Sequence, residues 1–197
     1  MNDLCTDIGY KSINHYGEQL CGDHVDIVER GENSTVIVLA DGLGSGVKAS
    51  ILSTLTSKII STMMAEGLPL EECVSTIAAT LPVCSSRGVA YSTFTIVHVI
   101  NNESAELIQY DNPHVILIRD EEYYDYPKTE MNIDGKKIYK KLFTYSNIND
   151  CADREILFKW LLFFKRKIWF IFMVLIKPFT TIPKFIFNCK DFAQSFW

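Results

Sequence analysis

The sequence lacks the cysteine spacings of a zinc ribbon or of a dense disulfide framework. Its six cysteines include no Cys-x-x-Cys pair, and the two nearest in sequence are eleven positions apart. The first residues, MNDLCTDIGYKS, contain neither a basic segment nor an apolar run, so no secretory signal is visible. We therefore expect a cytoplasmic protein with free thiols.

An excess of basic residues is also missing. The net charge is −5 over 197 residues, whereas proteins that bind nucleic acids usually have a basic balance. The hydrophobic content of 48% is that of a globular protein, and the length suffices for one domain with a proper core. The composition thus argues against a nucleic-acid partner.

Glycine and net negative charge are absent from the last part of the chain. Residues 1–140 hold all ten glycines and have a charge balance of −10. Residues 141–197 have a balance of +5 and hold all three tryptophans and eleven of the twelve phenylalanines. Two parts of one domain rarely differ so much, so we predict an incomplete domain at 1–140 and an atypical hydrophobic, basic tail at 141–197.

The tail has no uninterrupted apolar run that could span a bilayer. Residues 160–176 are strongly apolar, but Lys165, Arg166 and Lys167 interrupt them, and only nine apolar residues follow, against about 20 for a span. Three interpretations stay open: a segment that lies in a membrane interface, a core helix that replaces missing strands, or foreign sequence from a shifted reading frame. The glycine-free composition favours the third.

Several segments have the β-branched and aromatic residues of strands. They are 23–30, 34–40, 90–100, 103–110 and 114–120. The turn GENS joins the first two into a hairpin, and Asn101-Asn102 is a two-residue turn between the next pair. We expect the last three strands to form an antiparallel meander.

Between these strands, a four-residue spacing predicts a helix over 45–66. Its apolar stripe consists of Val47, Ile51, Leu55, Ile59 and Met63, widened by Leu52 and Ile60. We expect this stripe to pack on the sheet. A second helix is predicted between Pro69 and Pro82. The order of elements indicates an α+β fold, with an antiparallel sheet and helices on one face.

Two aspartates lie at the open end of the first predicted hairpin. In an antiparallel pair centred on Glu32, Asp23 lies opposite Asp41. Directly opposite side chains have Cβ atoms roughly 5 Å apart. Two like charges so close are unfavourable unless a positive charge lies between them, which indicates a divalent cation. The alternative is that both residues simply end strands in water.

Three alternating glycines follow the second aspartate. The spacing of Gly42, Gly44 and Gly46 fits neither the P-loop nor the dinucleotide-binding fingerprint. We interpret them as positions where bare backbone must come close to something. A metal-bound water or a carbonyl–metal contact fits this interpretation, with the Gly42 carbonyl as the natural donor.

The stretch CGDHVDIVERGENSTVIVLADGLGSGVKAS resembles the metal-binding core of the metal-dependent Ser/Thr protein phosphatases, the PPM family. Within it, Gly22-Asp23 and Asp41-Gly42-x-Gly44-x-Gly46 match the SpoIIE-like bacterial branch. The later LIQYDNPHVILIRD resembles that branch's Gly-Asn-x-Pro turn, with Asp111 where glycine is usual. The resemblance covers most of residues 1–140.

This resemblance implies a β-sandwich of two antiparallel sheets flanked by helices, and a centre of two Mn²⁺ or Mg²⁺ ions. It implies that Asp41 bridges both ions, Asp23 binds one, and the Gly42 carbonyl binds the other. It further implies that activated water hydrolyses a phosphoserine or phosphothreonine on a phosphorylated regulatory protein of the anti-anti-sigma type.

The family's later acidic ligands are missing from the pattern after residue 140. The only later Asp-Gly pair, Asp134-Gly135, precedes the strand after which the family has its acidic ligand, so we interpret it as a turn. The sequence therefore leaves an alternative open: a catalytically inactive phosphatase fold that binds phosphoproteins. A membrane-associated regulator anchored through 160–176 is a third possibility.

Overall fold

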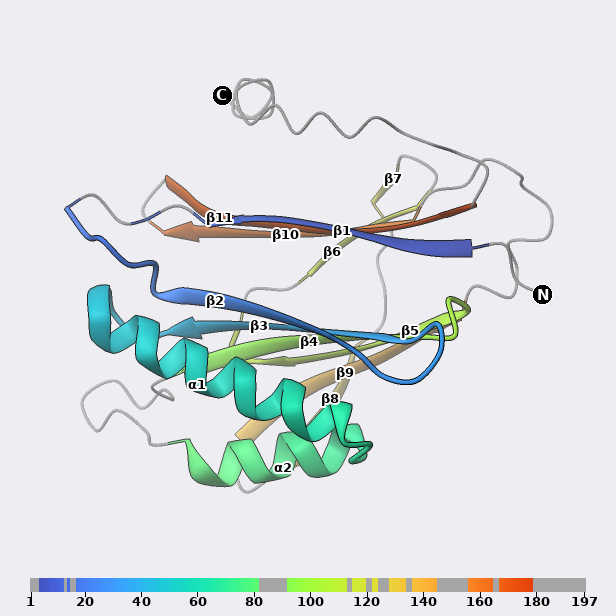
Figure 1. Ribbon diagram of the computed structural model, residues 1–197, viewed down its shortest axis with the longest axis horizontal. Helices are drawn as coiled ribbons and strands as arrows, with labels where there is room; N and C mark the ends of the chain where they lie inside the picture. Colours follow the sequence, from blue (N-terminus) through green and yellow to red (C-terminus); the bar gives the residue numbers. More distant parts are fainter. Residues whose placement is uncertain are drawn as a thin grey trace.

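Two antiparallel sheets lie face to face in the computed structural model, and both helices cover the outer face of the larger sheet (Figure 1). The helices are α1 (Gly46–Ala65) and α2 (Leu70–Thr80). The predicted α+β sandwich is therefore confirmed. The structure describes residues 4–12, 14, 17–81, 92–112, 115–119, 122–123, 128–133, 136–144, 156–164 and 167–178.

The larger sheet has the strand order β2-β3-β4-β5-β9-β8. Its strands are β2 (Asp23–Glu29), β3 (Thr35–Gly42), β4 (Ser92–Ile100), β5 (Ser104–Tyr110), β8 (Thr129–Ile133) and β9 (Lys136–Thr144). Both predicted hairpins are confirmed. The predicted two-residue turn is wrong by one residue, because Ile100 pairs with Ser104 and the loop is 101–103; within it Asn101 and Asn102 have φ of 52° and 53°.

The smaller sheet has the order β1-β11-β10-β6-β7. Its strands are β1 (Leu4–Ser12), β6 (Ile116–Arg119), β7 (Glu122–Tyr123), β10 (Ile156–Phe164) and β11 (Lys167–Pro178). The predicted meander is wrong for the segment 114–120, because β6 pairs with β10 instead of β5. The free side of β5 is occupied by β9, so the chain crosses to the second sheet after β5.

The described backbone of the tail forms strands. β11 pairs with β1, and β10 pairs with both β11 and β6 (Figure 1). The core-helix interpretation is therefore wrong for 156–164 and 167–178, in keeping with the strand preference of aromatic and β-branched residues. The boundary near residue 140 and the membrane contact of 160–176 stay predictions. Among the described residues, no helix is both long and apolar enough to cross a bilayer.

A hydrophobic core fills the space between the larger sheet and the two helices. It contains fifteen buried residues from both layers: Val36, Val38, Ala40, Ile60, Met64, Leu70, Cys73, Val74, Ile77, Ala78, Phe94, Ile96, Ile108, Tyr110 and Ile138. The rings of Phe94 and Tyr110 are tilted, with centroids 5.3 Å apart. This core holds both helices on the sheet whose edge carries the two aspartates.

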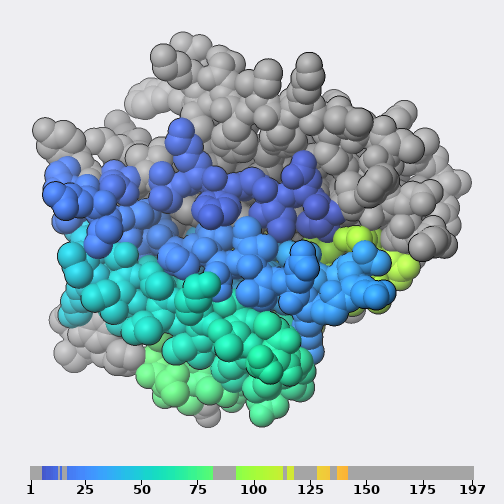
Figure 2. Space-filling model, viewed as in Figure 1, coloured from blue at the N-terminus to red at the C-terminus, as the bar shows by residue number. Residues whose placement is uncertain are grey.

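The orientation of α1 differs from the prediction. Val47, Ile51, Leu55 and Ile59 are between 44% and 62% exposed, and α1 lies at the surface (Figure 2, teal). Small residues face the sheet instead: Ala49, Ser53, Thr56, Ser57 and Ser61. The reason is that the first turns of the helix contact β3 closely, at Gly42, whereas Ile60 and Met64 in its second half are fully buried in the core. Of the predicted stripe, Ile60 is fully buried in the core and Met63 packs against it.

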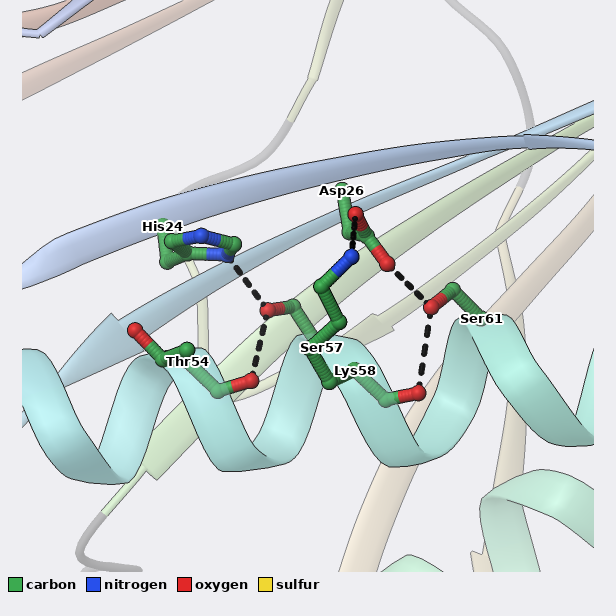
Figure 3. A network of polar contacts seen from close by, with 6 residues as sticks. All are labelled: His24, Asp26, Thr54, Ser57, Lys58 and Ser61. Atoms are coloured by element: carbon green, nitrogen blue, oxygen red, sulfur yellow. Dashed lines mark hydrogen bonds and ion pairs between the residues drawn. The ribbon is translucent and has the colours of Figure 1, made fainter.

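Polar contacts fasten the small-residue face of α1 to β2 (Figure 3). His24 Nδ1 lies 2.7 Å from Ser57 Oγ. Lys58 Nζ donates to Asp26 Oδ1 at 2.6 Å, and the Ser61 hydroxyl donates to the other oxygen of the same carboxylate. These contacts explain why serines occupy the buried face, since β2 presents polar side chains to it.

Candidate metal centre

Asp23 and Asp41 lie directly opposite each other in the β2–β3 ladder, in the predicted register. The neighbours of both residues face the helices, because His24 contacts α1 and Ala40 belongs to the helix-side core. Side chains alternate along a strand, so both aspartates point to the opposite face, toward the smaller sheet. The sandwich thus holds two carboxyl groups side by side between its layers.

The environment of the pair favours the protonated form of each carboxyl group. Burial, together with the charge of the neighbouring Asp41, raises the pKa of Asp23 to about 8. Burial also raises the pKa of Asp41. Two carboxyl groups in one desolvated site cannot both ionise without a compensating charge, so the pair holds a proton near neutral pH unless a cation replaces it.

Gly42 has a structural reason to be glycine that differs from the predicted one. A Cβ at this position would lie 2.1 Å from the carbonyl oxygen of Ala49 in α1. The backbone of β3 therefore touches the backbone of the helix. The Gly42 N–H donates to the Gly22 carbonyl at 3.0 Å, which fixes the end of β3 beside the start of β2. The predicted role of the Gly42 carbonyl as a metal ligand stays a prediction.

The side chain of Glu18 lies beside the N-terminus of α1, a contact that the sequence did not predict. Its Oε1 accepts a hydrogen bond of 3.1 Å from the Ser45 hydroxyl, and a Cβ at Gly46 would lie 2.7 Å from its Oε2. A carboxylate is favourable at the positive end of a helix. No sequence pattern connects Glu18 with a helix that begins 28 positions later, so only the fold identifies the contact.

Two further groups border the pair. Cys21 Sγ lies 3.9 Å from Asp23 Oδ2, and burial together with the charge of both aspartates raises the pKa of its thiol. On the other side, Thr93 of β4 lies directly opposite Asp41. Its hydroxyl donates to Oδ1 of Asn112, a residue in the DNP turn that resembles the family motif.

The oxygen atoms at this site are of the kind that binds a hard divalent cation, but they are too few for a complete set of ligands. Carboxylate and carbonyl oxygens, here from Asp23, Asp41 and Gly42, are the ligands that Mg²⁺ and Mn²⁺ prefer. A cation between the two carboxylates would also relieve their repulsion. Over the part of the chain that the structure describes, no cluster of three or more His, Cys, Asp or Glu side chains is found. The described residues therefore supply two acidic ligands and no third.

The family model of stage II sporulation protein E (SpoIIE) matches residues 31–133, which is more than half of the chain. The chain belongs to the SpoIIE family. No curated protein sequence matches it. The resemblance in the sequence motifs is thus confirmed by an independent match that includes Asp41 and the DNP turn.

Solved structures share the fold of this SpoIIE-family chain. The PP2C phosphatase domain of SpoIIE from Bacillus subtilis, with a regulatory fragment, superposes with a TM-score of 0.69 at 13% identity over 93% of this chain and 66% of that one. The RsbU and RsbW domains of a Mycobacterium tuberculosis protein give 0.63 and 14% over 90% and 61%. RsbX in complex with magnesium gives 0.60 and 15% over 89% and 96%.

The lengths of the first two structures exceed that of this SpoIIE-family chain. It spans slightly less than two thirds of the Bacillus subtilis chain and of the Mycobacterium tuberculosis chain. At these identities the likeness shows the fold, the sandwich of PP2C phosphatases. The activity and the partners of the longer proteins come to this chain only as a proposal.

Proposed function

We propose that this chain is a metal-dependent protein serine/threonine phosphatase that removes phosphate from a phosphoserine or phosphothreonine of a regulatory protein. The observation that carries the proposal is the Asp23–Asp41 pair, whose partly buried carboxyl groups lie directly opposite each other. Membership of the SpoIIE family and the PP2C-type fold support it.

Each residue of the centre has a role in this proposal. Asp41 and Asp23 hold two Mn²⁺ or Mg²⁺ ions, with the Gly42 carbonyl as a further ligand. Such ions, when bound, supply Lewis acidity and a nucleophile at neutral pH for phosphate-ester hydrolysis. The chain positions the carboxylates through the β2–β3 ladder and keeps β3 in place through its backbone contact with α1.

The partner we propose is a phosphorylated regulatory protein of the anti-anti-sigma type. The similar structures include RsbU and RsbW domains, and another was described in work on the bacterial stressosome. The net charge of −5 supports a protein partner over a nucleic acid. This partner belongs to the same proposal as the phosphatase activity.

Hydrolysis of an aryl phosphate tests the activity. Rates are measured with Mn²⁺ and with a chelator for the unchanged chain, for Asp41→Asn, and for Glu29→Gln as a control carboxylate on the exposed part of β2. We expect Mn²⁺-dependent turnover that Asp41→Asn abolishes and Glu29→Gln retains. Equal rates under all conditions would contradict the proposal and favour the inactive phosphoprotein-binding alternative.

We further propose that residues 141–197 differ in origin from residues 1–140, although β9 crosses this boundary and β10 and β11 complete the smaller sheet. The change in charge balance and in glycine content supports this boundary. The coding DNA beyond codon 140 should contain a Ser-Asp-Gly-type motif in another frame, and its absence from both other frames would remove the frameshift explanation. Flotation with anionic liposomes, with and without 141–197, tests the membrane contact.

A further inference from the structure

A polar row crosses three neighbouring strands beside the carboxyl pair. Asp23 lies opposite Asp41, and Asp41 lies opposite Thr93, on the successive strands β2, β3 and β4. Directly opposite residues project from the same face of a sheet, with Cβ atoms roughly 5 Å apart. The Thr93 hydroxyl therefore borders the Asp41 carboxyl group on the side away from Asp23.

Both the oxygen and the nitrogen of the Asn112 side-chain amide form hydrogen bonds with threonines of β4. Its Oδ1 accepts a hydrogen bond from the Thr93 hydroxyl, and its Nδ2 donates to Thr95 Oγ1 at 3.1 Å. Asn112 is 9% exposed and its bond to Thr95 is buried, whereas Thr93 is partly exposed. The preceding Asp111 has φ of 52°, a left-handed conformation at the turn that follows β5.

A threonine hydroxyl carries a single proton, and here that proton is donated to Asn112. Without this acceptor, the Thr93 hydroxyl would be free to rotate and to donate to the neighbouring Asp41 carboxylate. Such a bond would occupy an oxygen lone pair that a cation needs. It would also stabilise the carboxylate without a cation.

We propose that Asn112 is a positioning residue for the candidate metal centre: it keeps the Thr93 proton away from Asp41 and so leaves the Asp41 oxygens available to a divalent cation. This inference rests on the proposed function. It concerns a residue that contacts neither aspartate in the described hydrogen bonds and acts through Thr93 alone.

The test is Mn²⁺ affinity, measured from the electron paramagnetic resonance signal of free Mn²⁺, in a two-residue mutant cycle. Asn112→Ala should weaken binding about tenfold, the effect of one hydrogen bond to a charged group. Thr93→Val, which keeps the shape and removes the hydroxyl, should not weaken binding. The double variant should bind as Thr93→Val does, because the hydroxyl that Asn112 restrains is gone.

A merely structural role predicts the opposite pattern. If Asn112 only fills space, the double variant binds Mn²⁺ at least as weakly as Asn112→Ala, which overturns the inference. A tenfold loss in Thr93→Val alone overturns it as well, and this variant decides the matter if Asn112→Ala fails to fold. If the unchanged chain itself does not bind Mn²⁺, the proposed function fails together with the inference. Binding by the unchanged chain with equal affinity in Asn112→Ala refutes the inference alone.

Discussion

Replacing Gly42 by alanine tests the backbone contact that holds α1 against β3, next to Asp41. The added Cβ would lie 2.1 Å from the carbonyl oxygen of Ala49, 2.7 Å from its carbonyl carbon and 2.9 Å from its Cα. All three are backbone atoms of a helix, so no flexible side chain can move aside. Overpacking costs about 1–3 kcal/mol, and we expect the upper end, about 3 kcal/mol. For a chain of this size, this lowers Tm by about 6–12 °C.

Thermal unfolding followed by circular dichroism measures this effect, and Gly22→Ala is the matched control. A Cβ at Gly22 would lie 3.2 Å from the side-chain Cβ of Ala49, a mild overlap that Ala49→Gly removes. In a protein that carries Ala49→Gly, Gly22→Ala should therefore no longer lower Tm, whereas Gly42→Ala should lower it as before. A Tm of Gly42→Ala within about 2 °C of the unchanged chain, or its rescue by Ala49→Gly, would refute the proposed backbone contact.

Three further predictions concern the pair, the exposed stripe and the polar contacts. Because the folded pKa of Asp23 is raised to about 8, its contribution to the stability of the metal-free protein should be fully present below about pH 4 and should be lost as pH rises toward 8. Denaturant unfolding without metal checks this, and an equal pH dependence in Asp23→Asn would contradict it. Leu55→Gln, on the exposed stripe, should change the unfolding free energy by less than about 0.5 kcal/mol, whereas Ser57→Leu, on the buried face, should cost about 2 kcal/mol. Urea titrations measure both, and the reverse order would show that the predicted stripe faces the sheet. Asp26→Ala should cost about 2 kcal/mol, because Lys58 and Ser61 lose their acceptor, and an unchanged urea midpoint would show that these contacts contribute nothing.

The register of the carboxyl pair was predictable because the hairpin is governed by local rules. Two regular strands and a short polar turn fix which residues lie opposite each other, and the aspartates occupy the strand ends. The hairpin turn at Asn101-Asn102 was predictable for the same reason, although its loop is one residue longer than expected. The glycine-containing motif around Asp41 then connected this geometry with a family, which the family match confirms.

The orientation of α1 was not predictable from spacing alone. The helix carries an apolar stripe and a stripe of small residues, and a helical period does not state which one faces the sheet. The backbone contact at Gly42 excludes large side chains from the interface near the start of the helix. His24 and Asp26 on β2 then supply hydrogen-bond partners for the buried serines. Both causes are tertiary, so the usual preference for burying aliphatic residues gave the wrong face.

The neighbours of the pair were missed for a related reason. Asn112 is 71 positions from Asp41 in sequence and lies near it only because it bonds to Thr93 of β4. Thr93 in turn becomes a neighbour of Asp41 only by strand pairing. The crossing of the chain from β5 to β6 was equally hidden, because segments that alternate in the same way can pair within one sheet or in two. Long-range pairing decides these contacts.

The stabilisation of the folded chain by Mn²⁺ tests most directly whether the Asp23–Asp41 pair holds a cation. Thermal unfolding is measured near pH 8 with and without Mn²⁺, for the unchanged chain and for Asp41→Asn. At an ion concentration about 100 times Kd, binding should stabilise the unchanged chain by about 2.7 kcal/mol and should leave Asp41→Asn unaffected. The absence of any shift in the unchanged chain, or an equal shift in Asp41→Asn, would contradict a metal centre at this pair.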